Sequence, residues 1–265
     1  MLRKCVGEIG VASTWDPDQY LKFHGPRIRP ALDLLAQMNV DSPETVYDLG
    51  CGPGNVTEFI QQRWPAADVI GVDASETMLA QARELHPDKT WIQADLTDWA
   101  PDAKADVLYS NAVFQWLQDH ETLLPGLVAN VREGGIFAFQ LPRNWNAPSH
   151  AIIHELVATS PHRAQLEPLL LHDPVHPPDY YYGLLRPHVS AIDIWETEYL
   201  QILDGENAVA EWTKGSTLKP LLDALKDEAA VFYAQYAANV ASRYPQRSDG
   251  KTLYPFRRLF VVARR

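Results

Sequence analysis

The stretch VYDLGCGPG, residues 46–54, decides the fold. An apolar run ends at Asp48, and Gly50, Gly52 and Gly54 then stand at every second position before a helical stretch. Glycine lets the backbone turn sharply and approach a ligand closely, and the helix behind presents unpaired N–H groups to the same place. The spacing is not G-x-G-x-x-G, since Asn55 stands three residues after Gly52, and no Gly-Lys-Ser/Thr follows as in a P-loop. The stretch therefore predicts a small-molecule site built from main chain.

Three more apolar runs close on polar residues. Residues 68–73, 91–95 and 105–111 end in Asp73, Asp95 and Asn111. Helical stretches lie between the runs, for example residues 75–84, where Ser75 is a typical N-cap before an apolar stripe. Alternating strands and helices predict a parallel sheet covered on both faces, whose ligands bind at the carboxyl ends of the strands. We therefore expect these polar residues and Asp48 to converge on one edge.

Taken together, this set resembles the class I S-adenosylmethionine-dependent methyltransferases. The resemblance implies an α/β fold, a seven-stranded, mostly parallel Rossmann-like sheet flanked by helices with a helical cap insertion. It also implies S-adenosyl-L-methionine as cofactor, with the glycine turn under its methionine part, Asp73 on both ribose hydroxyls and Asp95 on the adenine amino group. The implied cofactor-binding residues are Asp48, Gly50, Cys51, Gly52, Gly54, Asp73, Ala74, Asp95, Leu96, Asn111, Trp116, Trp15 and Tyr20.

A narrower resemblance runs nearly end to end, from about Trp15 to the C-terminus. The segments that carry it include WDP (15–17), RIRPA (27–31), NAVFQWL (111–117), DIW (193–195), EWTKG (211–215) and RLFVVAR (258–264). They resemble the trans-aconitate 2-methyltransferase family, whose members esterify one carboxylate of a small tricarboxylic acid. The resemblance implies the same activity here, with Gln115 flanking the acceptor.

Three departures bear on the acceptor. Pro26 stands where the family often has an acidic residue. Residues 141–144 read Leu-Pro-Arg-Asn where Met-Pro-Asp-Asn is common, so Arg143 replaces an aspartate. Residues 218–220 read Leu-Lys-Pro where the family has Leu-Arg-Pro, so Lys219 replaces an arginine. Arginine holds a carboxylate with two parallel hydrogen bonds, whereas lysine is a mobile point charge. Arg143 adds a cation that is able to compensate for the weaker hold of Lys219 on an acceptor carboxylate. The acceptor is therefore predicted to be trans-aconitate or a related small acid, such as a malonyl thioester or an isopropylmalate-like compound.

No catalytic base is expected. A carboxylate acceptor is already ionised near neutral pH, given a reference pKa of ~4, so the enzyme has to align it and exclude water. Arginines to hold the acceptor and aromatic walls to close the site are the expected tools. Arg257 and Arg258 alternate on the last strand, so at most one of them faces the site directly. The candidate substrate-binding residues are Arg27, Phe23, Gln115, Arg143, Lys219 and Arg258.

Composition sets the broad class. The 265 residues are 46% hydrophobic and 22% charged, as is ordinary for a globular protein. The net charge of −11 disfavours nucleic acid as a partner, and no apolar run approaches the ~20 residues that span a bilayer. Two cysteines predict no disulfide framework, and His150 and His154 lack a third ligand for a metal. We expect a cytoplasmic enzyme, monomeric or homodimeric, that binds a small anionic polycarboxylate.

The sequence predicts one domain with an insertion. Residues 1–14 are predicted to be a disordered tail and residues 15–265 the methyltransferase domain, with 144–189 as the cap insertion and 206–244 as a helical segment. A sixth strand is expected over 190–203, with a seventh strand antiparallel beside it. The N-terminal aromatic residues either pack on the sheet or form a lid. The alternative to an enzyme is a non-catalytic protein that senses S-adenosylmethionine.

Overall fold

The computed structural model describes residues 24–171 and 175–265, and the side chains from residue 28 onward. The expectations for residues 1–14, Trp15, Tyr20 and Phe23 lie outside the described residues. The described chain forms two compact units. We call residues 25–146, 171–202 and 253–265 the sheet unit, and residues 147–170 and 203–252 the helical unit.

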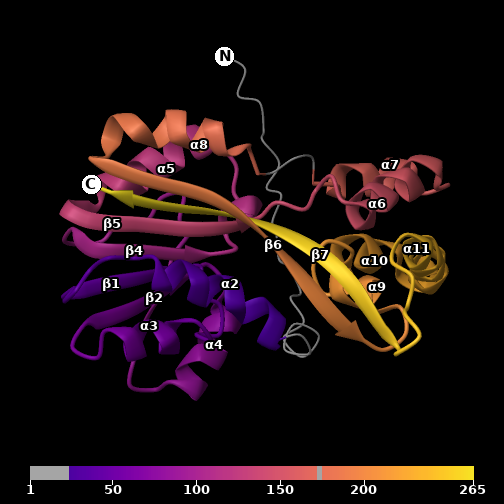
Figure 1. Cartoon of the computed structure of the whole chain (residues 1–265), viewed down its shortest axis with the longest axis horizontal. Helices are drawn as coiled ribbons and strands as arrows, with labels where there is room; N and C mark the ends of the chain where they lie inside the picture. The colour runs from indigo at the N-terminus through magenta and orange to yellow at the C-terminus, as the bar shows by residue number, and fades with distance from the viewer. Residues whose placement is uncertain (1–23, 172–174) are drawn as a thin grey trace, which may run out of the picture. The chain divides into compact units, whose positions relative to one another are not determined.

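The sheet has seven strands in the order β3-β2-β1-β4-β5-β7-β6 (Figure 1). The strands are β1 (Thr45–Leu49), β2 (Asp68–Asp73), β3 (Thr90–Gln93), β4 (Ala105–Asn111), β5 (Val131–Pro142), β6 (Ala191–Asp204) and β7 (Lys251–Arg264). The first five pair in parallel, and β7 runs antiparallel to β5. The predicted α/β class with a mostly parallel sheet is confirmed, and the seventh strand lies beside the sixth as expected.

Helices cover both faces of this sheet. They are α2 (His24–Ala36), α3 (Thr57–Arg63), α4 (Glu76–Leu85), α5 (His120–Ala129) and α8 (Pro178–Leu185), with short turns η1 (Phe114–Trp116) and η3 (Arg186–His188). Alternate residues of β4 and β5 enter two cores, because successive strand side chains point to opposite faces. Leu108 and Phe137 pack with α5 and α8, whereas Val107 and Ala138 pack with α2 and α3. Burial on both faces explains why these strands are almost continuously apolar.

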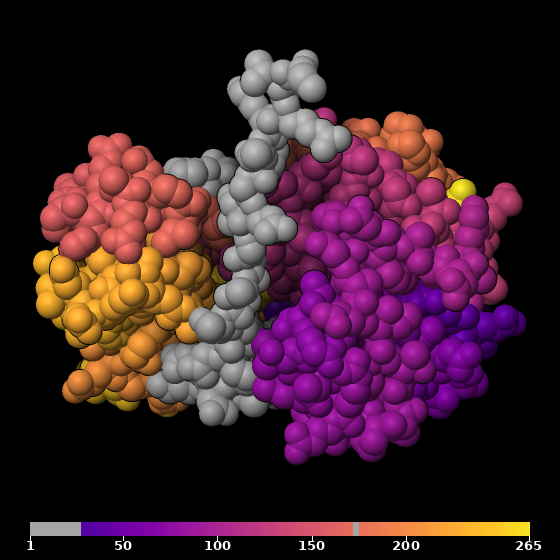
Figure 2. Space-filling model, turned by 180° about the vertical axis from the view of Figure 1, so that it is seen from behind, coloured from indigo at the N-terminus to yellow at the C-terminus, as the bar shows by residue number. Residues whose placement is uncertain are grey.

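The helical unit contains the other helices of the described chain. They are α6 (Pro148–Thr159), α7 (Arg163–Leu166), η2 (Glu167–Leu169), α9 (Ala208–Lys214), α10 (Lys219–Leu225), η4 (Lys226–Glu228) and α11 (Ala229–Arg243). Helix α6 packs against α11, and Figure 2 shows the salmon surface of residues 148–166 directly against the gold surface of α9–α11. The hydroxyl of Tyr236 donates to the carbonyl of Ser149 at 2.9 Å inside this packing. The segment 144–189 is thus divided, with residues 147–170 in the helical unit and residues 144–146 and 171–189 in the sheet unit.

Candidate functional site

The glycine turn after β1 contains three glycines in the left-handed region, and two of them also lack room for a side chain. Gly50, Gly52 and Gly54 all have positive φ, at 70°, 56° and 83°. A Cβ on Gly50 would lie 2.2 Å from Cγ2 of Val113, and one on Gly54 would lie 2.6 Å from the ring of Trp91. At Gly52 a Cβ would meet no atom of the described residues within 4 Å. With respect to this part of the chain, a ligand can approach the backbone of Gly52.

Asp73, the last residue of β2, holds the turn in place. One of its oxygens accepts from the N–H of Gly52 at 2.8 Å, and the other accepts from the N–H of Ser75 at 2.8 Å. A carboxylate offers roughly four acceptor positions, so each oxygen keeps capacity for a hydroxyl donor. The turn is fixed from its other side by Val72, whose carbonyl accepts from the N–H groups of Gly50 and Cys51. The carboxylate predicted for the ribose thus also shapes the glycine turn.

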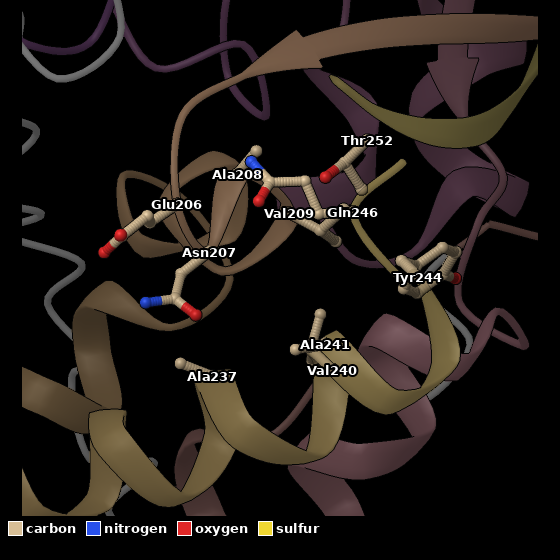
Figure 3. Close-up of a pocket in the computed structure, with 10 residues that line it drawn as sticks. All are labelled: Glu206, Asn207, Ala208, Val209, Ala237, Val240, Ala241, Tyr244, Gln246 and Thr252. Atoms are coloured by element: carbon tan, nitrogen blue, oxygen red, sulfur yellow. The ribbon is translucent and has the colours of Figure 1, made fainter. Parts of the chain in front are cut away.

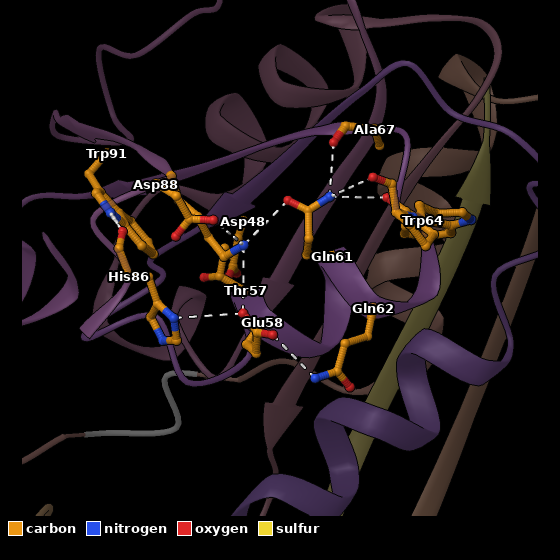
Figure 4. A network of polar contacts seen from close by, with 12 residues as sticks. Asp48, Thr57, Glu58, Gln61, Gln62, Trp64, Ala67, His86, Asp88 and Trp91 are labelled. Atoms are coloured by element: carbon orange, nitrogen blue, oxygen red, sulfur yellow. Dashed lines mark hydrogen bonds and ion pairs between the residues drawn. The ribbon is translucent and has the colours of Figure 1, made fainter.

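Asp48 lies beneath the turn with only 1% of its surface exposed. Its Oδ2 accepts a 2.6 Å hydrogen bond from the hydroxyl of Thr57 in the first turn of α3 (Figure 4). Burial raises the pKa of Asp48 to about 7, with a smaller contribution from the Asp73 carboxylate, while the Thr57 hydrogen bond opposes the shift. Burial and the same two carboxylates raise the pKa of the Cys51 thiol far above its ordinary value. Cys51 is therefore a protonated thiol and not a nucleophile.

The predicted adenine end lies just past β3. Asp95 follows the last residue of that strand by two positions and is exposed. Its Oδ1 accepts from the backbone N–H of Thr97 at 2.9 Å and from the Thr97 hydroxyl at 2.8 Å. Leu96 is buried at 6% exposure, and Ala74 is exposed after β2. Asp95 is thus oriented by a tight local turn, with an apolar side chain next to it.

At the predicted acceptor side, a polar cluster lies at the ends of β4 and β5. Asn111 pairs in register with Gln140, and the side-chain amide of Gln140 donates to Asn111 Oδ1 at 2.5 Å. The main-chain carbonyl of Gln140 accepts from the N–H of Ala112, which has a positive φ of 58°. Gln115 is buried, and its Nε2 donates to the carbonyl of Ala112 at 2.6 Å. Its Oε1 is buried without a hydrogen-bond partner among the described residues, so it is ready to accept from a ligand.

Arg258 joins this cluster from β7. It is 7% exposed, and its Nη1 donates to Gln140 Oε1 at 3.3 Å. Its guanidinium carbon lies 4.7 Å from the ring centroid of Phe256. Arg257 is exposed, and its guanidinium lies 3.8 Å from the carboxylate of Glu198. The strand alternation therefore buries Arg258 and leaves Arg257 exposed, so the two arginines face opposite ways.

The remaining predicted cations lie in different surroundings. Arg143 forms a 2.6 Å ion pair with Glu196. Lys219 begins α10 in the helical unit, where its ammonium lies 3.2 Å from the Asp223 carboxylate. Arg27 lies in α2, with its side chain outside the described part of the chain. Of the predicted substrate cations whose side chains are described, Arg258 is the one brought into the cluster with Asn111 and Gln140.

A hydrogen-bonded relay supports the η1 turn, which carries Gln115 and Trp116. The hydroxyl of Tyr181 in α8 accepts from the N–H of His176 at 3.2 Å and lies 3.1 Å from Nδ1 of His120. Nε2 of His120 lies 2.8 Å from the carbonyl of Phe114. A carbonyl only accepts, so Nε2 carries the proton and Nδ1 accepts from Tyr181. Burial lowers the pKa of His120, which favours this neutral form.

Gln140, Thr57 and the His120–Tyr181 pair support the predicted site residues in the structure, although no motif pointed to them. A single glutamine inside the apolar run 136–141 was a visible signal for Gln140. Thr57 lies three residues after Gly54, at the start of the helix behind the turn. The partnership of His120 with Tyr181 joins residues 61 positions apart and has no signature in the sequence.

Trp116 is exposed in the structure, whereas His150 is buried. Trp116 lies in η1 with 42% of its surface exposed, so it offers a ring at the rim of the acceptor side. His150 is buried beside the Ser149 hydroxyl, and burial lowers its pKa to about 4. Among the described residues, no three histidine, cysteine, aspartate or glutamate side chains gather to hold a metal ion. Likewise, no described helix is both long and apolar enough to span a bilayer.

A cavity of about 290 Å³ lies within the helical unit (Figure 3). Its lining residues are Glu206, Asn207, Ala208, Val209, Ala237, Val240, Ala241, Tyr244, Gln246 and Thr252. Glu206 is the single charged side chain of this lining. A polyanion needs cations around it, so the cavity lacks the chemistry of a polycarboxylate site.

Known proteins resemble the chain both in one domain and over nearly its whole length. A family profile described as a methyltransferase domain matches residues 46–135. The chain is 47% identical over 251 residues to the trans-aconitate 2-methyltransferase of Azoarcus sp. (strain BH72), covering 94% of this chain and 98% of that protein. It is 39% identical to the enzyme of the same name from Yersinia pestis (strain Pestoides F), with 94% and 97% covered.

Solved structures share the fold at low identity. The YcgJ protein of Bacillus subtilis superposes with a TM-score of 0.55 at 15% identity, covering 89% of this chain and 99% of that one. A phosphoethanolamine N-methyltransferase of Haemonchus contortus in complex with S-adenosyl-L-methionine gives a TM-score of 0.53 at 14% identity, with 89% and 52% covered. These likenesses show the fold alone.

Proposed function

The chain belongs to the trans-aconitate 2-methyltransferase family, and from this premise we propose that it methylates one carboxylate of trans-aconitate with S-adenosylmethionine as the methyl donor. The relatives that share this name are 39–47% identical to the chain over nearly its whole length. The structural observation that best supports the proposal is that a cofactor side and an acceptor side occur in one sheet. An open glycine cradle at Gly52 and a buried cation at Arg258 belong to the same sheet.

The cradle fits the proposed cofactor. Bare backbone at Gly52 and remaining acceptor capacity on Asp73 suit a ligand that carries hydroxyl and ammonium donors. Asp95 and Leu96 offer a carboxylate beside an apolar surface, which suits a purine with an exocyclic amine. When bound, S-adenosylmethionine supplies an electrophilic methyl group on a positively charged sulfur. We assign its binding to these residues together with Gly50, Gly54 and Asn111.

The residues on the acceptor side hold and orient the acid. The acceptor carboxylate is ionised near neutral pH, given a reference pKa of ~4, so it needs no base to become nucleophilic. We propose that the buried guanidinium of Arg258 holds a carboxylate that does not react, with two parallel hydrogen bonds. Asn111 and Gln115 line the approach, and Trp116 lies at the rim. Their task is to align the reacting oxygen and exclude water.

The acidic balance of the chain supports a small acceptor. A net charge of −11 opposes binding to nucleic acid, because phosphate contacts need clustered cations. We therefore propose a small polycarboxylate as the partner, a cytoplasmic setting, and a monomer or homodimer. Sedimentation of the purified protein across a tenfold range of concentration tests the last point.

Release of S-adenosylhomocysteine tests the function directly. Purified protein is given S-adenosylmethionine with trans-aconitate, with no acceptor, or with a panel of di- and tricarboxylates, while calorimetry measures cofactor binding separately. Turnover that is strongest on trans-aconitate supports the proposal. Stronger turnover on another acid keeps the reaction class and replaces the substrate. Cofactor binding without turnover on any acid contradicts the proposal and leaves a sensor of S-adenosylmethionine.

A further inference from the structure

Trp91 covers glycine main chain in two neighbouring segments of the cofactor side. It lies in β3, where it pairs in register with Gly71 of β2. A Cβ on Gly71 would lie 2.3 Å from Cε3 of the indole, and a Cβ on Gly54 would lie 2.6 Å from its Cη2. The ring therefore extends from β3 across β2 to the glycine turn after β1, and both glycines leave the room that it occupies.

The two contacts use different ends of the indole. Gly71 meets Cε3, which is near the Trp91 backbone, whereas Gly54 meets Cη2, the ring atom farthest from it. An aromatic ring over a glycine on the neighbouring strand is a recognised way to stabilise a strand pair. That purpose needs a ring no longer than phenylalanine. The extra length of tryptophan serves the contact with Gly54.

The indole is held in this orientation by the chain after α4. Its N–H donates to the carbonyl of His86, the C-cap of α4, at 3.1 Å (Figure 4). The imidazole of His86 lies beside the turn as well, because a Cβ on Gly54 would lie 3.2 Å from its Cδ2. Nδ1 of His86 is 3.6 Å from the carboxylate of Glu58, in the first turn of α3. Trp91 is thus tied to α4 at one edge and lies against the glycine turn at the other.

Gly54 closes the glycine turn. Its N–H donates to the carbonyl of Cys51 at 3.1 Å, and its carbonyl accepts from the N–H of Glu58 at 3.4 Å. Gly52 lies between Cys51 and Gly54, and a Cβ there would meet no described atom within 4 Å. A shift of Gly54 would therefore move the stretch of main chain that a ligand can approach.

From this arrangement we propose that Trp91 is a positioning residue for S-adenosylmethionine. Its indole holds Gly54, and through Gly54 the backbone of Gly52, in the conformation that binds the cofactor. Trp91 acts through the turn and not by touching the ligand. The inference rests on the proposed function through the cofactor alone, so substitution of Trp91 weakens cofactor binding and leaves recognition of the acceptor unchanged.

The decisive variant is Trp91→Phe, because phenylalanine still covers Gly71 but ends short of Gly54. Calorimetry without acceptor should show the dissociation constant of S-adenosylmethionine rising about 3–10-fold, and that of S-adenosylhomocysteine rising by a similar factor. The KM for trans-aconitate at saturating cofactor should stay within about twofold of the wild type, because the acceptor side does not share these contacts. Trp91→Ala, which uncovers Gly71 as well, should raise the dissociation constant further.

Trp64→Phe is the matched control. Trp64 is the C-cap of α3, and its indole N–H donates to the carbonyl of Val40 at 3.0 Å, so the change removes the same ring and the same kind of hydrogen bond. The ring packs in the core that contains Val107 and Ala138. We expect a loss of thermal stability at least as large as in Trp91→Phe, with a dissociation constant within about twofold of the wild type. Equal rises in the dissociation constant in the two variants would overturn the proposal, and so would an unchanged value in Trp91→Phe.

The proposed function and this inference fail in different ways. Absence of turnover by the wild type on every acid, with cofactor binding intact, contradicts the proposed function, while calorimetry of Trp91→Phe still decides the role of Trp91. Turnover on trans-aconitate by the wild type, together with unchanged cofactor affinity in Trp91→Phe, contradicts only the role of Trp91. Thermal unfolding identifies a variant that fails to fold. Gly71→Ala then carries the test, because its Cβ displaces the indole from the side of β2 and should raise the same dissociation constant.

Discussion

The two halves of the candidate site are built in different ways. The cofactor side is mostly main chain, within one short segment: Gly50, Gly52 and Gly54 turn beneath open space and Asp73 pins them. The acceptor side is mostly side chain and is gathered from residues 111, 140 and 258. A main-chain site tolerates few substitutions but is visible in the sequence. A side-chain site permits changes in specificity and becomes visible only in the fold.

The largest effect should come from Gly50, where the cofactor side lies against the segment that leads to η1. A Cβ at Gly50 would lie 2.2 Å from Val113, which precedes η1, and the positive φ of Gly50 adds strain. We expect Gly50→Ala to lower kcat/KM about 100-fold or more and to cost about 2–4 kcal/mol of stability. Steady-state kinetics and urea unfolding measure the two quantities.

Gly126→Ala is the matched control for this change. Gly126 lies in α5, and a Cβ there would meet no atom within 4 Å in the part of the chain that the structure describes. Alanine favours a helix over glycine by about 1 kcal/mol, so unchanged activity and slightly higher stability are expected. Equal losses in both variants would contradict the claim that Gly50 is special.

The next effect belongs to the acceptor side alone. Arg258→Lys keeps the charge but removes the planar fork, so the KM for the acceptor should rise about 10–100-fold while cofactor binding is retained. Arg257→Lys changes the adjacent, exposed arginine, which lies beside Glu198, and should have little effect. If the two lysine variants behave alike, the buried position of Arg258 is not what selects the acceptor.

This contrast explains how far the sequence alone could go. The glycine spacing and the ordered polar strand ends predicted the sheet and the positions of Asp48 and Asp73, because strand direction and chain order fix them. Neither charge nor spacing separated Arg258 from Arg143 and Lys219 as candidates. Their difference depends on strand pairing and on local partners such as Glu196 and Asp223. Glu196 lies 53 positions from Arg143, so that pair has no signature in the sequence. The Lys219–Asp223 pair has i,i+4 spacing and becomes recognisable once α10 is known to be a helix.

The cofactor side should also have an intrinsic cost in stability. The pKa of Asp48 is raised to about 7 in the folded chain, above the ~4 of an unfolded aspartate. The folded state therefore binds more protons between these values, and stability falls as pH rises through that window. Asp48→Asn, which keeps the acceptor for Thr57, should raise stability at pH 8 by roughly 1–4 kcal/mol and have little advantage below about pH 4.

Unfolding in denaturant at several pH values checks this expectation in the absence of cofactor. Asp98→Asn, at an exposed position, serves as the control and should leave the pH dependence unchanged. An Asp48→Asn variant that is less stable than the wild type at pH 8 would show that the buried carboxylate stabilises the fold. The cofactor side would then be free of the conflict between function and stability that we infer.

The smallest effect should arise from support of the acceptor side at a distance. Tyr181→Phe removes the hydroxyl that bridges His176 and His120, so η1 loses part of its support while every group facing the ligand remains. We expect a loss of about 1–2 kcal/mol in stability and a fall in kcat of about 3–10-fold, with cofactor affinity retained. Tyr182→Phe removes a hydroxyl from the exposed neighbour in α8 and should change neither quantity. The acceptor side is built of side chains, so its geometry depends on hydrogen-bonded relays such as the one through Tyr181 and His120. A Tyr181→Phe enzyme with the kcat of the wild type would show that the hydrogen bonds of Gln140 hold the acceptor side without this relay.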